Sequence, residues 1–177
     1  MDPVTYLGTL ILLIVGATTR LATRSRAVLA LNENPKEYDK LRADPGLIPT
    51  MVDEVIRWQT PLAHMRFDGD RRHGARRQTD QAGRQGRDVA CLGERDETAI
   101  DRANEFLIDR PDSKRHHLSF GWGVHFCMGS RMAEMQLRVL WEEIMKRYRM
   151  VEVMGEPVRV ASCCAGIQTL LVRLHPK

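Results

Sequence analysis

The chain has 177 residues, which is enough for one domain with its own hydrophobic core. Its 43% hydrophobic content is normal for a globular protein, and a net charge of +4 is too small to demand a nucleic-acid partner. The cysteines at 91, 127, 163 and 164 form no evident disulfide framework, which favours a reducing, cytoplasmic location.

The first predicted element is a helix over residues 5–16, TYLGTLILLIVG. It is apolar on nearly all sides, so we expect it to be buried on all sides. The apolar run Val4–Val15 is shorter than the roughly 20 residues that a membrane span requires, so no membrane span is predicted. Arg20, Arg24 and Arg26 then stand where a buried helix is expected to continue.

Two short helices follow. In residues 34–43, NPKEYDKLRA, Asn34 is the predicted N-cap and a proline occupies the first helical position. The prolines at 45 and 49 predict a loop, and residues 50–58, TMVDEVIRW, predict a helix that ends before Pro61. Glu54 and Arg57 share a face of that helix, and such a pair on its own is usually a solvated surface feature.

Residues 67–95 are dominated by arginine, glycine, glutamine and aspartate. Apolar residues recur there with neither strand nor helix periodicity, so the segment cannot bury enough surface to offset its ordering entropy. We predict an irregular, poorly ordered segment. A solvated loop is one interpretation and a basic arm for nucleic acid is another, although Phe67 alone offers a ring for base stacking.

The stretch 117–129, HLSFGWGVHFCMG, places one cysteine, Cys127, among three glycines. Glycines let the backbone approach a bulky group, and a helix beginning near Ser130 would direct its positive end at the sulfur. A single thiolate beside an aromatic ring suits a haem iron better than a lone metal ion. The alternatives are a structural cysteine, or a zinc site built from His116, His117, His125 and Cys127, although zinc ligands usually occur in closely spaced pairs.

Residues 130–148, SRMAEMQLRVLWEEIMKRY, predict a long amphipathic helix. We expect its methionine and tryptophan positions to be core, and i,i+4 ion pairs Glu134–Arg138 and Glu142–Lys146 on its exposed side. Residues 151–153 and 170–174 alternate like strands, with a turn at Gly155 and Pro157 between them. The apolar positions of the helix are Ala133, Leu137, Leu140, Trp141, Ile144 and Tyr148.

FGWGVHFCMG resembles the haem-binding signature of the cytochrome P450 family, Phe-Gly-x-Gly-x-His/Arg-x-Cys-x-Gly, at every defining position. The Glu-x-x-Arg of Glu54 and Arg57 is similar to the second hallmark of that family. The resemblance implies a mainly α (α+β) fold, with residues 1–177 forming one partial domain from the C-terminal part of the family fold. Its expected parts are a long apolar helix, a short E-x-x-R helix, the cysteine loop, the helix after it and a small β hairpin.

The resemblance also implies roles for individual residues. Cys127 would be the proximal iron ligand of haem b, and Arg66 would contact a haem propionate. The other cofactor-binding positions in the loop would be His125, Phe120, Gly121, Gly123 and Gly129. Arg110, in the segment NEFLIDRP at 104–111, would join Glu54 and Arg57 in a buried charge network.

The chain departs from the family pattern in three places. After Gly16 the family has an acid before a threonine, whereas this chain reads Ala17-Thr18-Thr19-Arg20, so only Thr18 or Thr19 would offer a catalytic hydroxyl. Residues 67–95 lack the apolar strands of the family, and the pattern resumes at Arg95. Shorter lapses occur at 16–27 and at 163–169, where the terminal hairpin is expected. We hypothesise a shifted reading frame, which the gene sequence would test.

The segments LGTLILLIVG, LALNENP, RWQTPLAHM and AEMQLRVLWEEI resemble the soluble bacterial branch that hydroxylates medium-chain alkanes at the terminal carbon. This resemblance implies a monooxygenase acting on alkanes or fatty acids, with O2 and with electrons from a ferredoxin and its reductase. Because it covers only part of such a protein, we expect little or no turnover from this chain alone. The alternatives are a non-catalytic haem-binding fragment and a basic binding protein that uses residues 67–95.

Overall fold

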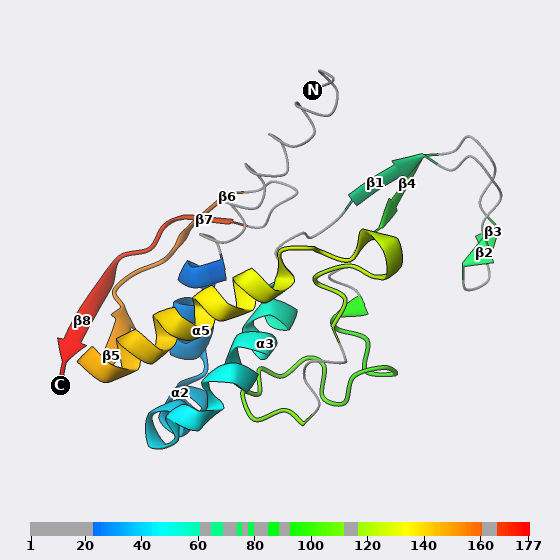
Figure 1. The fold of residues 1–177 in the computed structure, drawn as a ribbon. Helices are drawn as coiled ribbons and strands as arrows, with labels where there is room; N and C mark the ends of the chain where they lie inside the picture. The colour runs from blue at the N-terminus through cyan, green and yellow to red at the C-terminus, as the bar shows by residue number, and fades with distance from the viewer. Residues whose placement is uncertain are drawn as a thin grey trace, which may run out of the picture.

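Helices form the centre of the structure. The computed structural model describes residues 23–60, 65–68, 74–75, 78–79, 85–88, 93–111, 117–160 and 166–177. Residues 23–33 are helical and are followed by α2 (Pro35–Ala43), the 3₁₀ turn η1 (Pro45–Leu47) and α3 (Ile48–Gln59). The longest described helix, α5 (Ser130–Arg147), packs against α3 (Figure 1).

The hydrophobic core lies between these helices. Met51, Val52 and Val55 of α3 are almost completely buried, as are Leu137 and Trp141 of α5. Because α3 is covered by neighbouring segments on several sides, even its charged residues are buried. The core therefore surrounds the helix that carries the Glu-x-x-Arg pair.

The described strands form four antiparallel pairs. At the C-terminal end, β5 (Tyr148–Val153) pairs with β8 (Val172–Pro176), and β6 (Val158–Val160) pairs with β7 (Gly166–Thr169). Between α3 and the cysteine loop, β1 (Met65–Asp68) pairs with β4 (Gln85–Asp88), and β2 (Gly74–Ala75) pairs with β3 (Gln78–Thr79). The prediction of a mostly helical fold with small sheets is confirmed.

Two polar side chains attach β5 to the helices. The Asn32 amide donates to the carbonyls of Val28 at 2.8 Å and Val151 at 2.9 Å, and its Oδ1 accepts from the N–H of Val153 at 3.0 Å. The Tyr38 hydroxyl accepts from the N–H of Val151 at 2.9 Å, and burial raises the pKa of this hydroxyl. The contacts with Val151 and Val153 join segments more than 110 residues apart in the chain.

The predicted helix at 34–43 is confirmed as α2, but Asn34 does not cap it with its side chain, which donates instead to the Ala30 carbonyl at 2.8 Å. The loop predicted around Pro49 is wrong, because α3 begins at Ile48 and this proline lies in its first turn. Proline is tolerated there since a first-turn N–H has no partner within the helix. Thr60, in the left-handed conformation, ends the helix before Pro61.

The helix predicted over 130–148 is confirmed as α5, although the expectations about its two faces hold only in part. Trp141 and Met145 are core as expected, whereas Met132 and Met135 are about half exposed. The ion pairs also differ: Arg138 pairs with Glu142, and Glu143 binds the cations of the last turn, Lys146 and Arg147. Exposed pairs of this kind are weak, so sequence spacing alone does not select between them.

The strands predicted at 151–153 and 170–174 pair as β5 and β8, but the chain does not turn directly from one to the other. The pair β6–β7 intervenes, and β7 lies within the segment 163–169 where the family pattern lapses. Short strands also occur within 67–95. The apolar segment 5–16 lies outside the described residues, and no helix in the described part has the length and apolar character of a membrane span.

Candidate haem-thiolate site

The loop before α5 is shaped by two glycines with positive φ. Gly121 has φ 77° and Gly123 has φ 63°, a left-handed conformation that side chains disfavour. The chain turns sharply just before the first of them, where the Gly121 N–H donates to the Leu118 carbonyl at 2.7 Å. These two glycines are required by backbone conformation, as the sequence predicts.

The turn brings the cysteine back against the start of its own loop. After the 3₁₀ turn η3 (Gly123–His125), the N–H of Cys127 donates to the Phe120 carbonyl at 2.8 Å. The N–H of Ser130, the first residue of α5, donates to the Cys127 carbonyl at 3.2 Å. The cysteine is therefore fixed directly before a helix N-terminus, where the helix dipole favours a negative charge.

The Cys127 side chain is exposed and is not in a disulfide. A Cβ added at Gly129 would lie 3.8 Å from its Sγ, an ordinary van der Waals distance. A side chain at position 129 would therefore not clash with the sulfur in this structure. Gly129 is the N-cap of α5 and has a negative φ, which other residues also adopt.

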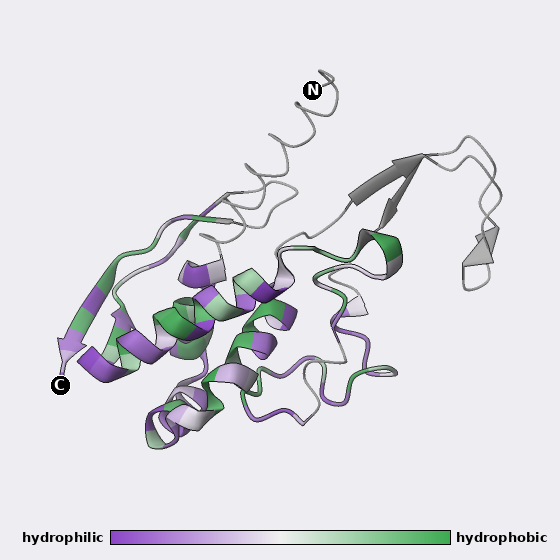
Figure 2. Ribbon diagram, viewed as in Figure 1, coloured by the Kyte–Doolittle hydropathy of each residue, from purple (hydrophilic) through white to green (hydrophobic). Residues whose placement is uncertain are grey.

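Large apolar side chains around the cysteine are unusually exposed. Val124 and Met128 are each 97% exposed and Trp122 is 80% exposed, while Leu118 and Phe126 are about half exposed. Figure 2 shows the hydrophobic colour of the short helical turn in the loop before α5. An exposed apolar surface around one thiol matches what a haem requires, because the porphyrin supplies four of the iron ligands and has broad apolar faces.

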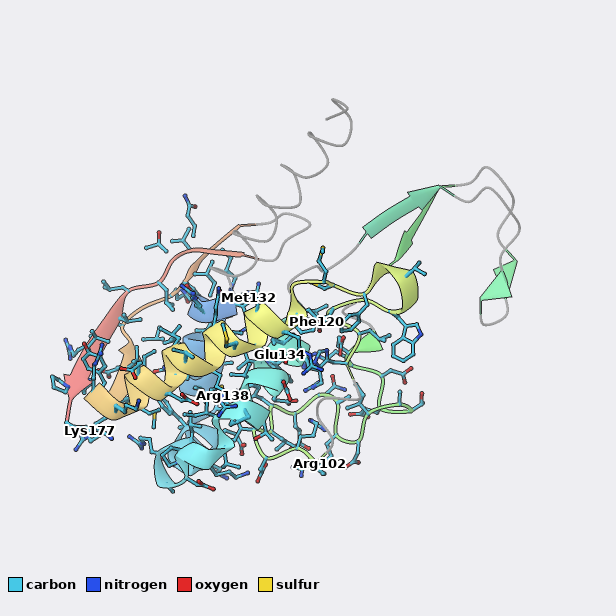
Figure 3. All side chains as sticks on the ribbon, in the orientation of Figure 1. Arg102, Phe120, Met132, Glu134, Arg138 and Lys177 are labelled. Carbon is cyan, nitrogen blue, oxygen red and sulfur yellow. The ribbon has the colours of Figure 1, made fainter. Side chains whose placement is uncertain are left out.

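Phe120 forms the inner boundary of this surface (Figure 3). Its ring is half-buried and lies 6.3 Å from the ring of Phe126 and 5.7 Å from that of His117. Burial, and secondarily the charge of Arg57, lower the pKa of His117, which favours a neutral imidazole. The His117 residue is partly buried, whereas Cys127 is exposed.

Below the loop, Glu54, Arg57 and Arg110 form the buried charge network that the sequence predicts. Arg57 donates Nε and Nη2 to the two Glu54 oxygens at 2.8 Å each, and Arg110 Nε donates to Glu54 Oε2 at 3.2 Å. Their side chains are at most 5% exposed. The solvated interpretation of the Glu54–Arg57 pair is therefore wrong, because the surrounding segments cover this face of α3.

The remaining guanidinium N–H groups bind backbone carbonyls. Arg57 Nη1 donates to the carbonyls of Glu94 at 2.7 Å and Ala103 at 3.0 Å. Arg110 Nη2 donates to those of Arg102 at 3.0 Å and Glu105 at 2.9 Å. Two arginines thus order the segment 94–110, which has almost no regular secondary structure of its own.

Glu94 is a site residue that sequence reasoning missed. Its side chain is fully buried, and Oε1 accepts from the N–H of Leu118 at 2.6 Å and from the Ser119 hydroxyl at 3.1 Å. Burial raises its pKa against the lowering effect of these hydrogen bonds. Because the Ser119 hydroxyl, which has one hydrogen to share, also lies 3.1 Å from the Ile56 carbonyl, the cysteine loop is anchored to α3 at its first residues. An acid at the end of a polar stretch gives no sequence signal for such a role.

The structure does not place several of the predicted site residues or their side chains. Thr18 and Thr19 lie outside the described residues, as do the side chains of Arg66, in β1, and His125, in η3. Within the described part, no three His, Cys, Asp or Glu residues gather in a geometry that holds a metal ion.

Comparison with known proteins agrees with the motifs. The family model described as cytochrome P450 matches residues 91–164. The chain is 43% identical to CYP153D17 from Sphingomonas sp. PAMC 26605, with a TM-score of 0.90, over 98% of this chain and 44% of that one. It is 40% identical to cytochrome P450-153 from Novosphingobium aromaticivorans, with a TM-score of 0.91, over 99% of this chain and 45% of that one.

Among curated proteins, the chain is 36% identical to cytochrome P450 126 of Mycobacterium tuberculosis, over 98% of this chain and 42% of the relative. The chain thus spans less than half the length of the relatives that it matches. These similarities agree with the sequence motif, the loop geometry and the buried charge network. The chain belongs to the cytochrome P450 family.

Proposed function

We propose that the loop at 117–129 binds haem b through the sulfur of Cys127. The observation that carries this proposal is the exposed thiol directly before the N-terminus of α5, surrounded by exposed apolar side chains. When bound, the haem would supply the oxygen chemistry of the family. The chain's own part is to present the sulfur, to cover a porphyrin face with apolar groups and to hold the loop in place.

The loop is held by hydrogen bonds from buried groups on the side of the core. Glu94 fixes Leu118 and Ser119, and the Phe120 carbonyl then fixes the N–H of Cys127. Arg57 connects this anchor to the charge network through the Glu94 carbonyl. The sulfur is therefore positioned by a chain of hydrogen bonds that begins in the core.

The proposed reaction is terminal hydroxylation of medium-chain alkanes or fatty acids. It is supported by the four sequence segments that resemble the alkane-hydroxylating branch and by the similarity to the two P450-153 structures. Thr18 or Thr19 would supply the catalytic hydroxyl. A ferredoxin with its reductase would supply electrons, and the exposed Arg131, four residues from Cys127, is the proposed contact for an acidic carrier.

The haem proposal is tested by adding haem to the purified chain and recording the ferrous carbonyl spectrum. Thiolate ligation shifts the Soret band far to the red, and Cys127→Ser should abolish that shift while Cys91→Ser preserves it. The same red-shifted band in Cys127→Ser would refute the assignment of the ligand.

The reaction is tested separately, with ferredoxin, reductase, NADH and an alkane. Because the described residues leave the loop surface open to solvent, we expect little or no product from this chain alone. Sustained alkane oxidation by the purified chain would contradict that expectation. If turnover is seen, Arg131→Ala should lower it at low ionic strength and have little effect at high ionic strength, where charges are screened.

A further inference from the structure

A polar cavity lies away from the cysteine loop, where three separate segments meet. It is lined by the helical residues 23–33, by the end of α3 and by the pair β6–β7, which Figure 1 shows beside one another. Its volume is about 180 Å³, well above the roughly 10–15 Å³ that a single water requires by the same measure. A small polar molecule or ion therefore fits.

The charged side chains lining this cavity are mostly positive. Arg26, Arg95 and Arg159 line it together with a single carboxylate, Glu33. The nearest Glu33–Arg159 approach is 3.9 Å, the outer limit of an ion pair, and both side chains are more than half exposed. One weakly paired carboxylate thus faces three guanidinium groups.

The positive charge of Arg26 is only weakly compensated by its neighbours. It is half-buried, and its described hydrogen bond is a long one of 3.4 Å from Nη1 to the Gln59 carbonyl. Burial, and next the charge of Arg159, lower the pKa of Arg26, so the two guanidinium groups repel one another. Two like charges held together are stabilised when an anion lies between them.

The floor of the cavity also carries unused hydrogen-bonding capacity. Gln59 is 7% exposed, and neither atom of its side-chain amide has a hydrogen-bond partner in the described structure. Buried amides are normally paired, so this residue is suited to a polar ligand or its bound water. Arg95 adds a guanidinium stacked 3.5 Å above the Trp58 ring, with Nη2 donating to the Trp58 carbonyl.

We propose that this cavity binds a small oxyanion, of the phosphate or carboxylate class, between Arg26 and Arg159. Guanidinium groups bind both classes through paired N–H donors, which makes them better suited to this role than point charges. The residues that line this cavity include none of the described residues of the cysteine loop.

The test is calorimetric titration of the full chain with inorganic phosphate and with citrate, against chloride at matched ionic strength. Saturable binding of either anion is expected, and the stronger of the two identifies the ligand class. Arg26→Gln should weaken binding about tenfold and Arg159→Gln about threefold, because each removes a charge-assisted contact. Arg102→Gln, on the loop labelled in Figure 3, is the matched control and should leave binding unchanged.

Glu33→Gln is the decisive variant, because it removes the one opposing carboxylate from an exposed position without disturbing the core. It should tighten binding about threefold. Binding no stronger than that of chloride, or equal affinity in the Arg26, Arg159 and Glu33 variants, would overturn the proposal. If Arg26→Gln does not fold, the two exposed variants still decide the question.

Discussion

The buried carboxylate of Glu54 is expected to be among the most sensitive positions of the fold. It accepts two hydrogen bonds from Arg57 at 2.8 Å, two from Arg110 at 3.2 and 3.5 Å and one from the N–H of Leu107 at 3.0 Å. Glu54→Gln keeps the side-chain volume but removes the charge and one of the two acceptor atoms. Two guanidinium groups then remain buried without their counterion.

Loss of one partner from a buried ion pair typically lowers the free energy of unfolding by about 3–5 kcal/mol. The matched control is Glu142→Gln on α5, whose carboxylate pairs with Arg138 at 2.8 Å on the exposed side of the helix (Figure 3). Exposed i,i+4 pairs contribute about 0.3–0.5 kcal/mol. The two variants should therefore differ roughly tenfold in effect.

The measurement is urea unfolding of the full chain, followed by far-ultraviolet circular dichroism. The double variant Glu54→Gln/Arg110→Gln should be less destabilised than the sum of the two single variants, because it removes one of the unpaired guanidinium groups. A loss below about 1 kcal/mol for Glu54→Gln, or one equal to that of the surface control, would refute the reasoning.

Three further outcomes are expected. Because burial raises the pKa of Glu94 above its ordinary 4.5, ionisation of Glu94 opposes folding, and the free energy of unfolding should fall as pH rises from about 4.5 through the folded-state pKa. Glu94→Gln, which keeps the Oε1 acceptor, should flatten that fall in urea midpoints measured between pH 4 and 8, and an unchanged slope would contradict this. Gly123→Ala should lower the free energy of unfolding by about 1–2 kcal/mol because φ is 63°, whereas Gly155→Ala, with open space and no positive φ, should be nearly neutral. Asn32→Ala should lower it by about 1–3 kcal/mol and accelerate hydrogen exchange at the N–H of Val153; unchanged exchange would show that Asn32 does not hold β5.

The parts of the site that the sequence predicts are those encoded by neighbouring residues. The cysteine loop is contiguous from Phe120 to Gly129, and its left-handed positions at Gly121 and Gly123 follow from the motif. The helix after the loop follows from its 3.6-residue periodicity, and α2 from the position of its proline. Such features depend on local backbone preferences, which a short stretch of sequence carries in full.

Burial depends instead on segments that are distant in the chain. Arg110 reaches Glu54 across 56 residues and Glu94 reaches Leu118 across 24, and neither spacing has a periodic signal. The same limit explains the exposure of Met132 and Met135, since apolar character does not reveal whether another segment covers a side chain. The sequence alone determined the family and the glycine positions of the loop, and through the family resemblance it predicted Cys127 as the ligand and a buried network of Glu54, Arg57 and Arg110. The tertiary structure decided that Glu94 is buried and which apolar groups remain open, because burial is set by the packing of separate segments.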